Sequence, residues 1–338
     1  MRIAIDAMGG DHAPKEVIKG SIQAVKDFDI NIVLIGKESI IKEELQAYKF
    51  PVEKVHIKNA DEIITNEDTP TKAIKNKKDS SLVVGLKMLK TGEADAFVSA
   101  GNTGALLTGA LLLVGRIKGV DRPALTPILP TDNGCALLVD AGANTSCKPE
   151  NFLQFGIMGS AYMKKVLGID TPRVGLVNVG TEEGKGNDLT KTAYNLLKNA
   201  PINFLGNIEA REIPGGIADV IVCDGFVGNV MLKLMEGMGL TFYSNIKKIF
   251  TKNILTYFSA LLVKSGLKEF KKKMDYTEYG GAPLLGIDGV VIKAHGSSNA
   301  KAFYSAIRQT KKFVETGVID EIKQYICVTG EDNFDSNE

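Results

Sequence analysis

The sequence predicts an α/β protein, a doubly wound sandwich built on a largely parallel sheet. Short, nearly continuous apolar segments alternate with glycine turns and helical segments along the chain, as is typical of parallel strands that are buried on both faces. The 338 residues exceed the size of roughly 250–300 residues at which single cores stop growing. We therefore expect one large α/β unit of two lobes over residues 1–338.

Each apolar run supports one strand of this sheet. The predicted strands are Arg2–Ala7, Asn31–Ile35, Ala94–Ala100, Cys135–Asp140, Arg173–Asn178, Ile217–Cys223 and Val290–Ala294. Pro14 suits the first turn of a helix that extends to about Phe28. In this architecture ligands bind at the carboxyl ends of the strands, so the residues that follow each strand are the first candidates for function.

One internal similarity pairs two of these strands. Residues 92–104 align with residues 216–228 at a constant offset of 124, and six of the thirteen positions are identical. Each segment predicts a strand, a Gly-x-x-Gly turn and a helix. Two interpretations stand: a functional pairing, or turn chemistry shared by any two strand-to-helix connections.

Composition excludes several classes of function. The 41 basic and 40 acidic residues leave a net charge of +1, which argues against a nucleic-acid partner. Four cysteines without a Cys-x-x-Cys pair and three histidines predict no metal site. The chain has no apolar run of about 20 residues and begins directly in a strand. We expect a cytoplasmic protein.

A lysine-rich segment, residues 247–273, differs from the rest of the chain. It holds eight lysines and one glutamate around an apolar centre, Ile254–Val263. Three interpretations stand for this amphipathic helix: contact with an anionic membrane surface, a core helix with a basic edge, or a dimer helix. The acidic tail, residues 330–338, is expected to be disordered.

Glycine-rich strand ends predict a phosphate site. Backbone N–H groups at helix starts attract anions, and glycine lets an oxyanion approach closely. Tight turns without a ligand are the alternative interpretation. The candidate phosphate-binding residues here are Gly9, Gly10, Gly101, Asn102, Thr103, Gly104, Gly225, Gly228 and Ser297.

Further candidates follow other strands. Lys185 lies in a glycine-rich loop that lacks P-loop spacing, and it could neutralise an oxyanion or stay solvated. His295 could donate a hydrogen bond to a phosphate, or it could only form hydrogen bonds with buried backbone groups. Cys147 could be a nucleophile, although a structural thiol is favoured. The lysines of residues 72–78 could attract an acidic partner or form a solvated face.

Together these motifs resemble the bacterial phosphate acyltransferase family, the acyl-ACP:phosphate transacylases. The matching segments, which run from residue 1 to about 325, are Asp6–Asp11, Asp79–Ser81, Ser99–Ala105, Arg122–Ala124, Gly142–Asn144, Cys147–Glu150, Gly180–Glu182, Lys185–Asn187, Asp224–Phe226, Gly228–Val230, Tyr279–Gly286 and His295–Ser298. The chain departs from the pattern at Thr145-Ser146, where Val-Asp is expected.

The resemblance implies a fold, a reaction and a set of partners. It implies a three-layer αβα sandwich like isocitrate and isopropylmalate dehydrogenases, assembled as a homodimer. The implied reaction transfers a long acyl chain from acyl carrier protein to inorganic phosphate for phospholipid synthesis, without a cofactor. Lys185 and Asn229 are implied to be catalytic, with His295 as a further donor and Asn144 among the phosphate-binding residues.

The resemblance also implies peripheral membrane association through a protruding helical hairpin, residues 240–275. The residues expected at the membrane or the carrier are Lys252, Leu255, Phe258, Leu261, Leu262 and Lys264. Two other classes stay open. An NAD-dependent decarboxylating dehydrogenase would use Asp219 and Asp224 as metal ligands, and a membrane-surface scaffold would rest on the basic helix alone.

Overall fold

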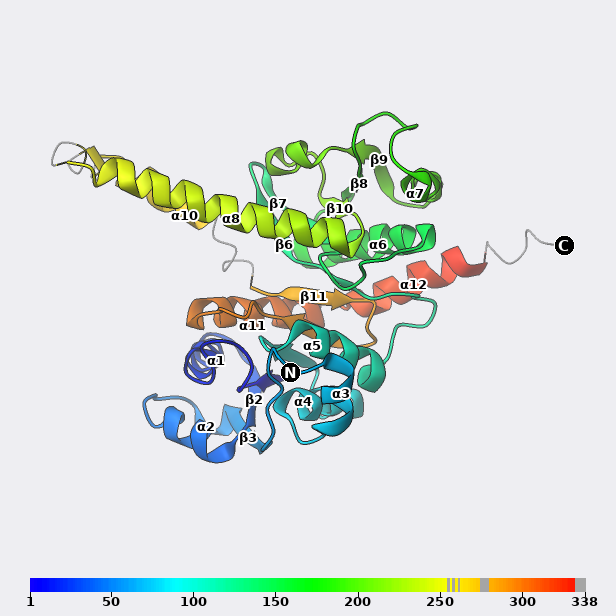
Figure 1. Ribbon diagram of the computed structural model, residues 1–338. Helices are drawn as coiled ribbons and strands as arrows, with labels where there is room; N and C mark the ends of the chain where they lie inside the picture. The colour runs from blue at the N-terminus through cyan, green and yellow to red at the C-terminus, as the bar shows by residue number, and fades with distance from the viewer. Residues whose placement is uncertain (254–255, 257–258, 261, 274–279, 332–338) are drawn as a thin grey trace.

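The computed structural model describes residues 1–253, 256, 259–260, 262–273 and 280–331. Within these residues the α/β prediction is confirmed, because two mainly parallel sheets are covered by helices (Figure 1). The first sheet has the strand order β3-β2-β1-β4-β12-β11-β5, and the second has the order β6-β7-β10-β8-β9. The strands are β1 Arg2–Asp6, β2 Asn31–Gly36, β3 Val55–Asn59, β4 Ala96–Ser99, β5 Ala124–Leu125, β6 Ile128–Thr131, β7 Gly134–Val139, β8 Arg173–Val177, β9 Asn203–Ile208, β10 Val220–Val222, β11 Ala282–Leu285 and β12 Val290–Lys293.

Helices cover both faces of each sheet. The α-helices are α1 Lys15–Asp27, α2 Glu38–Leu45, α3 Pro70–Asn76, α4 Ser81–Thr91, α5 Thr103–Gly109, α6 Pro149–Tyr162, α7 Asp188–Lys198, α8 Gly225–Phe250, α10 Lys264–Lys273, α11 Ala300–Glu315 and α12 Val318–Glu331. Shorter helical turns are η1 Val52–Lys54, η2 Ala110–Val114, η3 Met163–Leu167 and η4 Ala210–Gly215.

Alternating side chains divide the core into layers. In β1, Ile3 and Ile5 join one core cluster, whereas Ala4 points to the opposite face of the sheet. The cluster that contains Ile3 also includes Phe155 of α6 and Leu176 of β8. One continuous apolar core therefore joins the two sheets and fixes the edges at which their strands end.

The predicted strands are all present, with bounds shifted by at most three residues. The pairing was predicted to be parallel, and three neighbouring pairs differ: β11 is antiparallel to β12 and to β5, and β6 is antiparallel to β7. The predicted helix from Pro14 is α1. The paired segments 92–104 and 216–228 are β4 with α5 and β10 with α8, the central strands of two different sheets.

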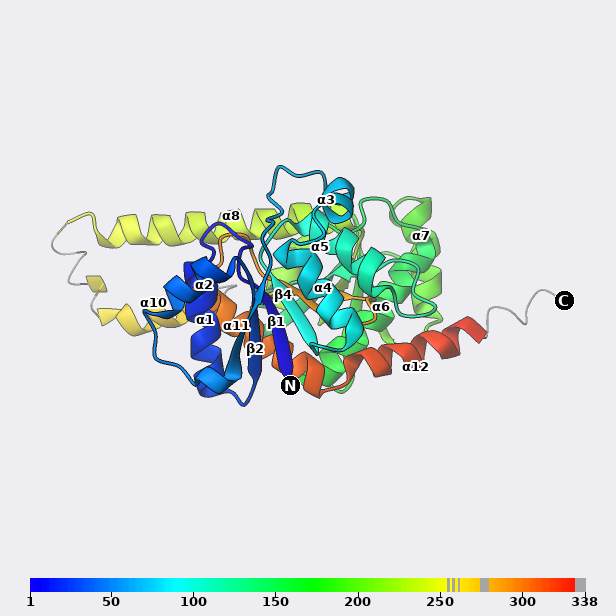
Figure 2. The same cartoon turned by 90° about the horizontal axis from the view of Figure 1, so that it is seen from below.

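The long helix α8 extends away from the sheets in both views (Figures 1 and 2), and α10 lies at the same end of the molecule. Its 26 residues span about 39 Å at the rise of an α-helix. In the lysine-rich segment, Lys252, Leu262 and Lys264 are exposed. Leu255, Phe258 and Leu261, and the tail from residue 332, lie outside the described residues.

Candidate functional site

A cleft of about 330 Å³ lies where the ends of β4 and β12 meet the first turns of α8. Its lining includes Thr103 at the start of α5 and Gly142 from the loop after β7. Asn229 and His295, two residues singled out from the sequence, also line it. The cleft thus gathers residues from both sheets at the carboxyl ends of their strands, the edge at which α/β proteins bind ligands.

Of the four glycine-rich strand ends, the three at Gly9–Gly10, Gly101–Gly104 and Gly296–Ser298 meet beside this cleft. A Cβ on Gly9 would lie 2.7 Å from the backbone nitrogen of Gly101, and one on Gly10 would lie 3.1 Å from the carbonyl oxygen of Gly296. Gly10 also has a φ of +104°, which favours glycine. These glycines let the three turns approach one another closely. Beneath them Asp6 is buried and accepts a hydrogen bond from Ser99 Oγ (2.7 Å), and burial raises its pKa.

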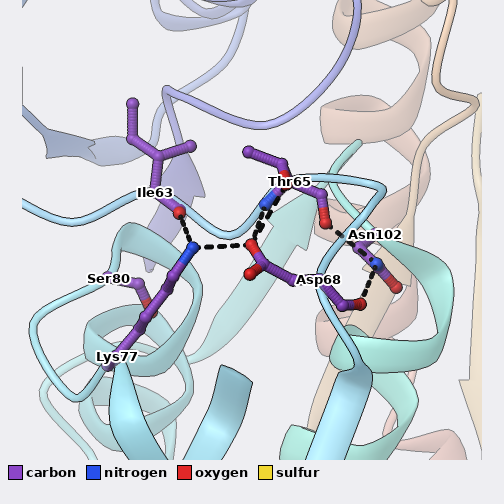
Figure 3. A network of polar contacts seen from close by, with 6 residues as sticks. All are labelled: Ile63, Thr65, Asp68, Lys77, Ser80 and Asn102. Carbon is purple, nitrogen blue, oxygen red and sulfur yellow. Dashed lines mark hydrogen bonds and ion pairs between the residues drawn. The ribbon is translucent and has the colours of Figure 1, made fainter. Parts of the chain in front are cut away.

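Asn102 holds the turn before α5 (Figure 3). Its Oδ1 accepts from the Ala105 amide (2.9 Å), and its Nδ2 donates to the carbonyl oxygens of Thr65 (3.0 Å) and Asp68 (3.3 Å). Lys77 pairs with Asp68 at 2.6 Å and lowers the pKa of that carboxyl. Protein groups therefore take both N–H donors of the Asn102 amide. Gly104 lies one residue into α5, where a Cβ would lie 2.7 Å from Pro70.

The fourth glycine-rich end, Gly225–Gly228, belongs to the second sheet and packs on the loop after β7. A Cβ on Gly225 would lie 2.7 Å from the carbonyl oxygen of Asn144, and one on Gly228 would lie 1.9 Å from that of Asp140. The Asn144 amide donates to Pro123 (2.7 Å) and to the buried Asp140 carboxyl (3.0 Å). These residues fix the start of α8.

Asn229 follows directly, on the first turns of α8. Its side chain is exposed to the cleft and makes no hydrogen bond within the part of the chain that the structure describes. A Cβ on Gly142 would lie 3.7 Å from Asn229 Oδ1, so the loop after β7 borders this amide. Asn229 is thus positioned to donate to an oxygen atom in the cleft.

His295 lies two residues after the end of β12 and lines the same cleft. Burial lowers its pKa, with Glu236 opposing and Lys233 and Lys293 adding to this effect. Nδ1 lies 2.9 Å from Ser297 Oγ and accepts from the Ser297 amide (3.3 Å). Nε2 therefore carries the proton of the neutral ring, and it lies 3.9 Å from Glu236 Oε1. Ser297 orients this histidine.

Sequence reasoning missed Lys293, the last residue of β12. Its side chain lines the cleft although the residue is only 8% exposed. The signal was a lysine inside an otherwise apolar strand, Val290–Ala294, since lysine is almost never fully buried unless it is paired.

Lys185 lies elsewhere, on the loop between β8 and α7 of the second sheet. Its side chain is 51% exposed, and Nζ lies 3.8 Å from Glu182 Oε1. The loop is closed by Asn178 Nδ2, which donates to the Lys185 carbonyl oxygen (3.1 Å). Lys185 does not line the cleft that Asn229 and His295 share.

Comparison with known proteins places this arrangement in a family. A sequence model described as "Fatty acid synthesis protein" matches residues 1–321. A phosphate acyltransferase of Alkaliphilus oremlandii is 57% identical over 335 residues, which cover 99% of this chain and 100% of the relative. The chain belongs to the phosphate acyltransferase family. A second member, from Thermoanaerobacterium thermosaccharolyticum, is 55% identical over 332 residues, and the match covers 98% of each chain.

Solved structures support the fold of this family member. A phosphotransacetylase from Streptococcus pyogenes superposes with a TM-score of 0.66 at 15% identity, covering 93% of this chain and 94% of the other. A 4-hydroxythreonine-4-phosphate dehydrogenase from Klebsiella pneumoniae gives 0.54 at 11% identity, with 93% and 99% covered. At these identities the likeness concerns the three-layer αβα sandwich alone.

The aspartates considered as metal ligands are engaged within the protein. Asp219 pairs with Arg173 at 2.9 Å, and Asp224 accepts from the Val227 amide as the N-cap of α8 (2.9 Å). Among the described residues, no three His, Cys, Asp or Glu side chains gather as a metal site would require. No helix within those residues is both long and apolar enough to cross a bilayer.

Cys147 is a poor nucleophile as it stands. Burial, with the nearby carboxyls of Asp140 and Asp224, raises the pKa of its thiol to about 11. Sγ lies 3.6 Å from the Asn144 carbonyl oxygen. Because the thiolate is the reactive form, this environment disfavours a nucleophilic role for Cys147.

Proposed function

We propose that this chain transfers a long-chain acyl group from acyl carrier protein to inorganic phosphate, giving acyl phosphate for phospholipid synthesis. Membership of the phosphate acyltransferase family carries this proposal. The cleft supports it chemically, because it combines a buried cation with an uncommitted amide at the ends of parallel strands.

The reaction needs orientation more than proton transfer. A phosphate oxygen attacks the thioester carbonyl carbon, a C–O bond forms, the C–S bond breaks, and the carrier thiolate leaves and takes a proton from water. The tetrahedral intermediate carries negative charge on the former carbonyl oxygen, which preorganised donors stabilise. We assign the Asn229 amide to that oxygen and His295 Nε2 as a further donor.

The direct test is an assay for acyl phosphate. Purified protein, acyl-loaded carrier protein and phosphate should yield a product that hydroxylamine traps as the hydroxamate. Omission of phosphate should abolish the product. Hydroxamate formed equally without phosphate would mean that water or an enzyme thiol accepts the acyl group, and the proposal would fall.

Lys185 is proposed to neutralise phosphate, as the family resemblance implies. We expect Lys185→Ala to lower phosphate-dependent turnover by roughly a hundredfold or more, as for loss of an oxyanion donor. Steady-state rates at saturating acyl donor measure this effect. Lys185 does not line the cleft, so the family resemblance alone supports this assignment. A near-wild-type rate would remove Lys185 from the mechanism.

Cys147 is expected to be dispensable. Cys147→Ala should retain turnover within about threefold, because a thiol whose pKa is raised to about 11 contributes almost no thiolate at neutral pH. Mass spectrometry of wild-type protein quenched during turnover should show no acyl adduct on Cys147. An adduct that forms and decays with turnover would contradict direct transfer.

Acyl carrier protein, an acidic partner, is proposed to dock on a lysine-bearing face. The candidates are residues 72–78 and the segment 247–273, and the described part of the latter exposes Lys252 and Lys264. Charge steering makes association salt-sensitive. The KM for acyl carrier protein should therefore rise steeply with added salt, and an unchanged KM would exclude electrostatic docking.

We also propose that the chain is a cytoplasmic homodimer held peripherally on the inner face of the membrane. Apolar side chains four residues apart form one exposed face of α8, which a second copy would cover: Phe226, Val230, Leu234, Met238 and Phe242. The lysines of segment 247–273 favour anionic lipid. Light scattering should give twice the chain mass, and a monomer would reject the dimer. The protein should co-sediment with anionic but not with neutral vesicles, and no preference between the lipids would reject the membrane assignment.

A further inference from the structure

Lys293 has an environment that is unusual for a lysine. It lies at the end of β12, in the middle of the first sheet, and is 8% exposed. Its Nζ donates to the carbonyl oxygens of Ala100 (3.3 Å) and Ala294 (2.5 Å), which follow the ends of β4 and β12. The ammonium group therefore lies across the mouth of two adjacent parallel strands, on the wall of the cleft.

This charge has no anionic partner in contact. No carboxylate among the described residues lies within ion-pair distance of Nζ, although Asp6 and Asp11 act on it from farther away. An ammonium group has three N–H donors, and the two carbonyl oxygens take two of them. Burial of an unpaired charge is costly, and such groups concentrate at functional sites.

We propose that Lys293 is the phosphate-binding cation of the cleft, and that its third N–H donates to an oxygen of the bound phosphate. The identity of the anion rests on the proposed function, whereas the existence of an anion site does not. The ammonium and the Asn229 amide line the same cleft. Phosphate on Lys293 would therefore lie beside the group assigned to the thioester oxygen.

Two other groups near the cleft that could attract an anion are already engaged within the protein. The first amide of α11, on Ala300, donates to Glu16 Oε2 (2.7 Å). A carboxylate of the protein itself therefore already occupies the start of this helix. Lys233 is exposed and pairs with Glu236 at 2.8 Å. Of the two lysines that line the cleft, Lys293 is therefore the one whose charge is left for a ligand.

Binding of inorganic phosphate, measured by calorimetry without an acyl donor, tests the proposal. Lys293→Met keeps the length of the side chain and removes the charge, and it should weaken phosphate binding by about tenfold or more. Lys90→Met is the matched control, because Lys90 also donates to a backbone carbonyl oxygen, that of Val114 (2.9 Å), away from the cleft. Wild-type affinity in Lys293→Met, or no phosphate binding by the wild type, would overturn the inference.

A titration keeps the proposal testable even if Lys293→Met does not fold. Sulfate keeps the same charge across the pH range of the titration, so a change in its affinity reflects a change in the charge of the protein. Burial lowers the pKa of Lys293 to about 8, and sulfate affinity should be high below that pH and fall as pH rises through it. The groups that face Lys293 are Asp6, Asp11, His295, Lys233 and Glu236. Lys293→Arg, whose guanidinium stays charged, should abolish the fall, and a fall that persists in Lys293→Arg would overturn the assignment.

Turnover separates the two proposals. If Lys293→Met raises the KM for phosphate and leaves the KM for the acyl donor unchanged, both stand. If phosphate binds through Lys293 but no acyl phosphate forms, the proposed function fails alone. If turnover and the KM for phosphate are unchanged in Lys293→Met, the inference fails alone.

Discussion

Asn229→Ala should lower acyl transfer to phosphate by roughly a hundredfold or more, as expected when one preorganised oxyanion donor is lost. The amide lines the cleft and makes no hydrogen bond to the described residues, so its removal leaves no protein group unsatisfied. The loss should therefore appear in kcat, with the KM for phosphate and the melting temperature nearly unchanged. Initial rates and a thermal melt measure both effects.

Asn229→Asp is the control that separates charge from shape. The carboxylate has the same size but cannot donate when ionised, and it would repel the oxyanion. Its turnover should fall at least as far as that of Asn229→Ala. A variant of either kind with a wild-type kcat would show that the amide does not contact the reacting oxygen.

Gly228→Ala should destabilise the fold by about 1–3 kcal/mol and reduce activity together with stability. The added Cβ would lie 1.9 Å from the Asp140 carbonyl oxygen and 3.0 Å from Cys223 Sγ. Because the carbonyl oxygen belongs to the backbone, the start of α8 must move away from the loop after β7. That shift would carry Asn229 with it. Denaturant unfolding of the full chain measures the free energy.

Gly237→Ala provides the matched comparison on the same helix. A Cβ there meets no atom within 4 Å, so alanine should stabilise α8 by about 0.5–1 kcal/mol through its lower backbone entropy cost. If Gly228→Ala were as stable as Gly237→Ala, the close approach of α8 to Asp140 would not exist in solution.

The sequence predicted the strands whose residues are apolar on both faces, because burial on both sides leaves a continuous apolar run. It missed strands of other kinds. β3 is an edge strand with a single buried residue, β5 has two residues, and β6 and β11 contain Pro130 and Pro283. Such strands are defined by their neighbours in the sheet, which local patterns do not reveal.

The candidate site was predictable in part for a similar reason. Strand ends that carry glycine or histidine mark the edge of the sheet, and three of the four glycine-rich ends do lie together. The sequence could not show that Gly225 and Gly228 serve a contact in the second sheet, nor that Asn102 is engaged by Thr65 and Asp68. Those roles depend on distances between segments that are remote in the chain.

The continuity of α8 has a mechanical consequence. Asn229, Leu232, Lys233 and Glu236 on its inner turns line the cleft, while Lys247 and Lys248 near its outer end are exposed far from both sheets (Figures 1 and 2). One uninterrupted α-helix joins these places, and it packs at Gly228 against the loop that contains Asp140. We therefore expect a displacement of the outer end of α8 to shift the residues of this helix that line the cleft.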